Sequence, residues 1–221
     1  MKNACMEEIK ITSIKHWHEL LNDYRKKNYK FRGQSDENWE LIPKAGRKEY
    51  KKASDENIFR QWKRRAKFYI QSKNLTDWEY LSIAQHTGLP TRFLDWSHNP
   101  MVALFFCCCE NSEKNGAVYV SLVDKFVDDE KTKPFSLRSE ILFYQPVTSI
   151  DRLANQFGYF SVHKNPEKPF EKDELIKIII PKKFKSEFID MLNQYGINYL
   201  SLFPDLEGLS KHLSWFYNSE K

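Results

Sequence analysis

The sequence predicts an α+β fold in one domain, with a helical N-terminal half packed on a mixed or antiparallel sheet. Helical hydrophobic spacing dominates the first half of the chain, and alternating strand patterns dominate the second half. The two patterns do not alternate regularly, as they would in βαβ units with a parallel sheet. A chain of 221 residues is long enough for one large domain with a substantial core.

The elements of the first half follow from hydrophobic spacing and from the residues that begin and end them. Apolar residues three and four positions apart follow helix-capping Ser or Asp residues, which predicts helices. We expect helices at 13–27, 54–69 and 77–85, and a strand at 29–33 that stops in a turn at a glycine. The segment 89–99 is expected to be a loop, because Gly88 and Pro90 end the preceding helix.

The second half is expected to be mostly β. Pro100 suits the first turn of a helix over 101–111 that is apolar on nearly every side and therefore buried. Strands are expected at 116–123, 140–144, 159–162, 176–180 and 199–203, and helices at 150–157, 186–195 and 206–217.

Composition indicates an ordered protein with a mildly basic charge. Hydrophobic residues make up 41% of the chain and the net charge is +5, which suits a polyanionic partner without requiring one. The apolar run 101–109 is about half the length that a bilayer requires, and the N-terminus has no signal-peptide pattern. We therefore expect a cytoplasmic protein with no membrane partner. Three consecutive cysteines at 107–109 without a CxxC pair predict packed, reduced thiols and no metal site.

Two segments concentrate polar residues that folding alone would not require. They are FRGQ at 31–34 and QHTGLPTRFLDW at 85–96. The sequence has no phosphate-binding loop of the type GxGxxG or GxxxxGK[ST], and no GxSxG nucleophile motif. We predict that both segments line one cleft, with Arg32 and either His86 or Arg92 opening onto it. The alternative is a hydrogen-bonded plug in which Arg92 pairs with Asp95.

Four motifs, in this order, make the chain resemble the FRG-domain family. They are FRGQ, QHTGLPTRFLDWSHNPMVALFF, RLANQFGYF and LFPDLEGL, and they span residues 29–213. Phe93 stands where leucine is usual, and Ser97 where threonine is common. The resemblance divides the chain into an N-terminal helical extension at 1–28 and an FRG domain at 29–221. It also implies a bacterial toxin or phage-defence effector.

The order of the polar residues is similar to that of ADP-ribosyltransferases, which bind NAD without a Rossmann fingerprint. This resemblance implies an ADP-ribosyltransferase-like fold. An arginine ends an early strand, polar residues follow in a central segment, and an acid comes late. Arg32 would hold the NAD diphosphate or ribose, because a guanidinium pairs with phosphate in a bidentate fork. Glu207 would be the catalytic acid, with Asp205 and Glu140 as alternatives. Glu207 also suits a plain helix N-terminal charge.

The predicted site uses NAD as a substrate and no metal. Gln156 would recognise a ribose or an amide, and Tyr159 or Phe160 would pack on the nicotinamide. The complete set of cofactor-binding candidates is Arg32, Gln85, His86, Arg92, Asp95, Gln156 and Tyr159.

The predicted enzyme would transfer ADP-ribose from NAD to a macromolecule. RNA or single-stranded DNA is favoured over protein as the acceptor of ADP-ribose, with an antitoxin protein as a further partner. The basic face of helix 54–69 would bind the nucleic acid through Arg60, Lys63, Arg64 and Arg65. A solvated helix face is the alternative. Two other functions stay open: a non-catalytic nucleotide- or nucleic-acid-binding module, and a nuclease with a metal held by His86, Asp95 and His98.

Overall fold

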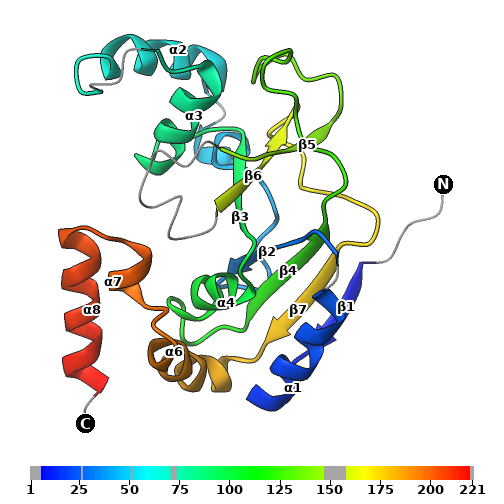
Figure 1. The fold of residues 1–221 in the computed structure, drawn as a ribbon, viewed down its shortest axis with the longest axis vertical. Coiled ribbons are helices and arrows are strands. Elements are labelled where there is room, and N and C mark those ends of the chain that lie inside the picture. Colours follow the sequence, from blue (N-terminus) through cyan, green and yellow to red (C-terminus); the bar gives the residue numbers. More distant parts are fainter. Residues whose placement is uncertain (1–5, 26, 51, 71–73, 147–157, 220–221) are drawn as a thin grey trace.

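The fold is built on one mixed sheet with helices packed against it (Figure 1). A computed structural model describes residues 6–25, 27–50, 52–70, 74–146 and 158–219. Seven strands, in the spatial order β1-β7-β4-β2-β3-β6-β5, form the sheet in this part of the chain. The pair β1 and β7 is parallel, and every other neighbouring pair is antiparallel. The predicted α+β class with a mixed sheet is confirmed.

The strands are β1 (Glu7–Lys10), β2 (Tyr29–Gln34), β3 (Phe93–Ser97), β4 (Gly116–Leu122), β5 (Ile141–Tyr144), β6 (Gly158–His163) and β7 (Ile176–Ile180). The α-helices are α1 (Ile14–Leu20), α2 (Asp55–Ala66), α3 (Asp77–His86), α4 (Pro100–Cys108), α6 (Lys185–Gln194), α7 (Tyr199–Leu202) and α8 (Leu206–Ser219). Local signals begin several of them. Thr76 and Glu79 form a capping box at α3, and Asn99 caps α4 just before a proline.

The core consists of clusters on the two halves of the sheet. Helices α4 and α6 pack on β2, β4 and β7, and Trp17 of α1 is buried against Phe188 of α6. Helices α2 and α3 pack on β3, β5 and β6, where Trp78 stacks on Phe93. A third cluster joins the two halves through side chains such as Trp96 and Tyr119. The N-terminal segment is part of this core, because β1 pairs with β7.

Helix α4 is the central buried helix, as its all-round apolar sequence predicts. Leu104 and Cys107 are fully buried. Cys107 and Cys108 are free and buried, which confirms the predicted packing of these cysteines in the core. Desolvation raises the pKa of the neighbouring Cys109 thiol to about 12, so it stays protonated at neutral pH.

Gly33 explains how β2 and α4 pack so closely. A Cβ atom at Gly33 would lie 1.8 Å from the backbone oxygen of Ala103 in α4. The prediction that the chain turns at this glycine is wrong, since β2 continues through Gly33 to Gln34 and pairs with β4 along its whole length. The glycine serves a strand–helix contact and no turn.

Two other predicted elements need correction, and one strand was missed. Residues 199–203 form helix α7 and no strand, because the Asn198 side chain caps the helix at Ser201. The predicted loop at 89–99 contains β3, and β1 was not expected at all. The predicted helix at 150–157 lies outside the described residues.

None of the helices in the described ranges is long and apolar enough to cross a membrane.

Candidate functional site

The candidate site is a pocket where β2 and β3 separate. The two strands pair only at Phe31 and Ser97 within the described residues. Beside this point is a cavity of about 310 Å³, lined by side chains from both strands, from α3, α4 and β6, and by one residue after α7. The lining residues are Phe31, Arg32, Gly33, Gln85, His86, Asp95, Trp96, Ser97, Val102, Ala103, Phe106, Gly158, Tyr159, Phe160 and Phe203. We call this cavity the Arg32 pocket.

Arg32 bridges the two strands at the pocket. Its Nη1 donates a hydrogen bond of 2.7 Å to the backbone oxygen of Asp95 and lies 3.7 Å from the Asp95 carboxylate. The Nε atom of Arg32 is buried and has no hydrogen-bond partner among the described residues. Desolvation lowers the pKa of Arg32 from its usual value, and the nearby carboxylate opposes that shift. The guanidinium keeps its charge, because arginine does not deprotonate in proteins.

A chain of hydrogen bonds holds the Asp95 carboxylate in place. Gln85 Nε2 donates to both carboxylate oxygens, at 3.1 and 3.0 Å. The hydroxyl of Thr91 donates to the other end of the same amide, so the orientation of the Gln85 side chain is fixed. About half of the Asp95 side chain is still exposed, at 52%, and can meet a ligand.

Aromatic rings form the rest of the wall. The imidazole of His86 lies 5.9 Å from the ring of Phe160, and Tyr159 and Phe160 both border the cavity from β6. The ammonium of Lys30 lies 4.3 Å from the centre of the Tyr159 ring. Such rings pack on the flat face of a base or another π system.

Comparison with known families identifies the segment that holds most of this pocket. Residues 27–116 match the FRG domain family. The chain contains an FRG domain. The match includes β2, α3, β3 and α4, and therefore all lining residues of the pocket except those from β6 and Phe203. No curated protein and no solved structure gives a significant match to the chain.

The geometry brings together five of the seven cofactor-binding candidates that the sequence singles out. Arg32 and His86 line one pocket, as expected, together with Gln85 and Asp95 from the matched segment and Tyr159 from β6. Sequence reasoning missed Phe106 and Phe203 as wall residues. Both stand inside the family motifs, but an apolar helix and a predicted strand gave no sign that they face a cavity. Gln156 lies outside the described residues.

Arg92 is not in the pocket, which corrects its predicted role beside Asp95. Its guanidinium forms a bidentate ion pair with Asp55 of α2, at 2.8 and 2.9 Å, and lies 4.5 Å from the ring centre of Phe135. Both partners are largely buried, so each needs the other's charge. Asp95 is already bound by Gln85 and Arg32.

Glu207 does not line the Arg32 pocket. It lies in the first turn of α8 and pairs with Lys211 one turn later at 2.9 Å. The predicted position at a strand edge is wrong, because the preceding segment is helix α7. The helix-charge alternative describes its surroundings correctly.

The two alternative carboxylates also lie elsewhere. Asp205 accepts a hydrogen bond of 2.8 Å from the backbone of Gly208, which caps the first turn of α8. Glu140 accepts a hydrogen bond from Asn165 and lies near Lys164 and Lys168. Neither residue lines the pocket.

The basic face of α2 is partly neutralised. Arg60 pairs with Glu56 at 2.6 Å, and Lys63 pairs with Asp77. Arg64 and Arg65 are exposed and form no ion pair with a described residue. Two of the four predicted nucleic-acid contacts therefore keep their full charge available.

The metal alternative finds no ligand cluster in the ranges that the structure describes. No group of three His, Cys, Asp or Glu side chains there is arranged to hold an ion. His98 is exposed and does not border the pocket that contains His86 and Asp95.

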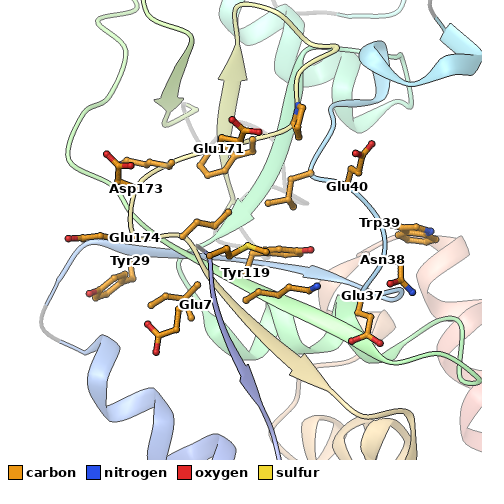
Figure 2. Close-up of a pocket in the computed structure, with 18 of the residues that line it drawn as sticks. Glu7, Tyr29, Glu37, Asn38, Trp39, Glu40, Tyr119, Glu171, Asp173 and Glu174 are labelled. Carbon is orange, nitrogen blue, oxygen red and sulfur yellow. The ribbon is translucent and has the colours of Figure 1, made fainter. Parts of the chain in front are cut away.

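A larger, open cavity of about 1390 Å³ lies on another part of the FRG-domain protein (Figure 2). Figure 2 shows Tyr119 near its middle, with Glu7 on one side and Glu37 and Glu40 on the other. Trp39 borders it and is 48% exposed. None of the predicted ligand-binding residues lies here, so we do not assign the site to it.

Proposed function

We propose that the Arg32 pocket binds a nucleotide, with NAD as the first candidate, and that the FRG domain transfers ADP-ribose from it to a macromolecule. One observation carries the proposal. A largely buried arginine, a half-exposed carboxylate oriented by an amide, and a wall of aromatic rings converge on one cavity. These are the groups that recognise a phosphate, a ribose and a flat ring system.

Each group has a distinct role in this proposal. Arg32 would bind a phosphate oxygen through the guanidinium donors that Asp95 does not use. The Asp95 carboxylate would accept hydrogen bonds from ribose hydroxyls, with Gln85 holding it in orientation. Tyr159 and Phe160 would pack on the nicotinamide. A volume of about 310 Å³ is near the lower end for small-molecule sites. It suits one nucleoside part of NAD, with the remainder along the surface.

The reaction exchanges one glycosidic bond for another. The bond between the nicotinamide nitrogen and ribose C1′ breaks, and its electron pair leaves with neutral nicotinamide. A nucleophilic oxygen or nitrogen of the acceptor bonds to C1′, and its proton passes to a carboxylate. We propose Asp95 for this role in place of Glu207, because it is the carboxylate that borders the pocket. Its negative charge would also stabilise the oxocarbenium-like ribose.

We further propose RNA or single-stranded DNA as the acceptor, bound through Arg64 and Arg65. Support comes from their exposure without an ion pair among described residues, and from the net charge of +5. A bacterial toxin or phage-defence effector, restrained by an antitoxin protein, remains the setting that the family resemblance implies.

Labelled NAD tests the enzyme directly. The purified chain is incubated with NAD labelled in the adenylate part and with a bacterial lysate, and released nicotinamide and labelled macromolecules are measured. We expect label that nuclease removes and protease does not. Asp95→Asn should abolish transfer, whereas Glu207→Gln, the matched control carboxylate, should leave it unchanged. Label that survives nuclease but is lost with protease would assign the acceptor to protein.

A second candidate function is a nucleotide-sensing module that binds without chemistry. It is favoured by the state of Asp95, whose carboxylate accepts two hydrogen bonds from Gln85 and lies beside Arg32. Calorimetric titration with NAD, ADP-ribose and ATP separates the two functions. Saturable binding through Arg32 without release of nicotinamide would support the sensing module.

A further inference from the structure

Helix α8 carries an apolar stripe that the rest of the described chain leaves uncovered. The helix lies at the edge of the molecule beside α7 (Figure 1). Its exposed large hydrophobic side chains are Leu206, Leu209, Leu213, Phe216 and Tyr217, with exposures of 80%, 37%, 43%, 39% and 71%. At 100° per residue they share one side of the helix.

An adjacent sector of α8 fixes the helix to the protein. Gly208 is buried, and a Cβ atom there would lie 1.9 Å from the backbone oxygen of Phe203. His212 and Trp215, at helical spacing from Gly208, are partly buried on the same side. This contact fixes the rotation of α8 about its own axis. The exposed stripe, which lies beside the anchored sector, therefore faces a fixed direction.

We propose that this stripe is a dimer interface, in which α8 packs antiparallel on α8 of a second copy of the chain. The spacing carries the proposal. Leu206, Leu209, Leu213 and Phe216 are separated by three, four and three residues, the a and d positions of a heptad. The spacing of three, four and three residues is the same in both directions along the helix. An antiparallel copy thus places Leu206 opposite Phe216 and Leu209 opposite Leu213.

The charge pattern favours a second copy over a membrane or a charged partner. The charges on α8 are Glu207 and Lys211, which pair with each other on the polar side. Two stripes can meet without like charges between them, and antiparallel helices oppose their macrodipoles. A membrane-surface helix typically carries several Lys or Arg residues on its polar face, and α8 carries one. The stripe is short, so we expect micromolar association.

Sedimentation of the full chain between about 1 and 100 μM tests the proposal. We expect a reversible monomer–dimer equilibrium that persists or strengthens as salt screens the +5 charge of each copy. Leu213→Glu should raise the dimer Kd at least tenfold. Phe68→Glu is the matched control, because Phe68 is 88% exposed on another part of the surface and should leave the Kd unchanged. Circular dichroism and thermal melting establish that both variants fold.

Crosslinking tests the antiparallel orientation. Leu209→Cys and Leu213→Cys are prepared separately in a Cys5→Ser, Cys109→Ser background and treated with a short bismaleimide. The mixture of the two should crosslink more efficiently than either variant alone. A chain that is monomeric over the whole concentration range would overturn the proposal, as would a dimer that Leu213→Glu leaves intact. Preferential crosslinking of Leu209→Cys to itself would overturn the antiparallel arrangement.

Discussion

Arg32 combines two roles in one side chain, since it closes the gap between two strands and presents a cation to a cavity. Its Nη1 satisfies the Asp95 carbonyl where the β2–β3 ladder ends, and its Nε faces no described partner. An arginine suits this position because its fork of donors can serve a backbone oxygen and a phosphate together.

Removal of Arg32 is predicted to weaken ligand binding while the protein still folds. Arg32→Ala should weaken NAD binding about ten- to a hundredfold, the scale of one lost hydrogen bond to a charged group. Calorimetric titration measures this effect. Arg32→Lys keeps the charge but loses the fork, so its affinity should fall between those of wild type and Arg32→Ala.

Stability measurements provide the control for Arg32. Arg32→Ala leaves the Asp95 carbonyl without its donor, which should cost about 1 to 3 kcal/mol of unfolding free energy. A larger loss with unchanged NAD affinity would mean that Arg32 is structural, and it would contradict the proposed role.

His163 gives the fold a predicted sensitivity to acid. It is buried beside Ser161, whose Oγ lies 3.2 Å from its Nε2. Desolvation lowers the pKa of His163 to about 4, so the folded state favours the neutral ring. The unfolded chain binds this proton near pH 6.5 and the folded chain near pH 4. The contribution is therefore complete above pH 6.5 and is lost as the pH falls toward 4.

His163→Gln is predicted to remove that part of the pH dependence. The difference in unfolding free energy between wild type and variant should change by about 3 kcal/mol from pH 7 to pH 4, since one pKa unit corresponds to about 1.4 kcal/mol. Urea unfolding at a series of pH values measures it. A difference that stays constant with pH would show that His163 does not titrate as predicted.

At the scale of secondary structure, the contact of β2 with α4 depends on the missing side chain of Gly33. Gly33→Ala places a methyl group where the Ala103 carbonyl lies, and neither backbone can yield without displacing α4. We predict a loss of about 3 kcal/mol or more in unfolding free energy. Chemical denaturation measures it.

The ion pair of Arg92 with Asp55 joins α2 to the start of β3. Arg92→Met should destabilise the fold by about 3 to 5 kcal/mol, because it leaves the Asp55 carboxylate buried without its partner. The double variant Arg92→Met, Asp55→Leu should recover part of that loss. Denaturant unfolding of both single variants and the double variant gives the coupling energy. Additive losses would contradict a coupled pair.

The success of the sequence predictions depended on how each element is buried. Strand β7 was predicted with its observed bounds, and β4 to within one residue. Four of the five residues of β3 are buried, so no alternation marked it, and the polar sequence of β1 at the sheet edge gave no hydrophobic signal. The segment of α7 has a strand-like pattern, but it forms a helix whose first turn is capped by the Asn198 side chain.

The candidate site was predicted better in its polar groups than in its geometry. Polar residues in an apolar setting attract attention, which is why Gln85, His86 and Asp95 were found. Arg92 was misplaced because its partner, Asp55, lies far away in the sequence. The predicted position of Glu207 at a strand edge was wrong, because the segment before it is a helix.

At the scale of the whole molecule, charge distribution bears on the acceptor. The chain carries +5, yet Arg60 and Lys63 are paired, so Arg64 and Arg65 supply the free charge on α2. Arg64→Glu with Arg65→Glu should reduce labelling of nucleic acid and leave NAD binding intact. Transfer by wild type should weaken steeply between about 50 and 200 mM salt. Radiolabel counting over a salt series measures both effects.

An equal change of charge elsewhere provides the comparison. Lys182→Glu with Lys183→Glu alters two exposed lysines outside α2. This variant should label nucleic acid more efficiently than the α2 variant. Equal losses in both variants would reduce the role of α2 to net charge alone.

The single pairing between β2 and β3 has a mechanical consequence. The sheet comprises two blocks, β1-β7-β4-β2 and β3-β6-β5. One residue pair and the third core cluster join them, and we call this junction the seam. The Arg32 pocket is located at that seam and takes lining residues from both blocks. A ligand that contacts both blocks would hold them together. Amide hydrogens of β3 should then exchange more slowly with solvent, although no bond within either block has changed.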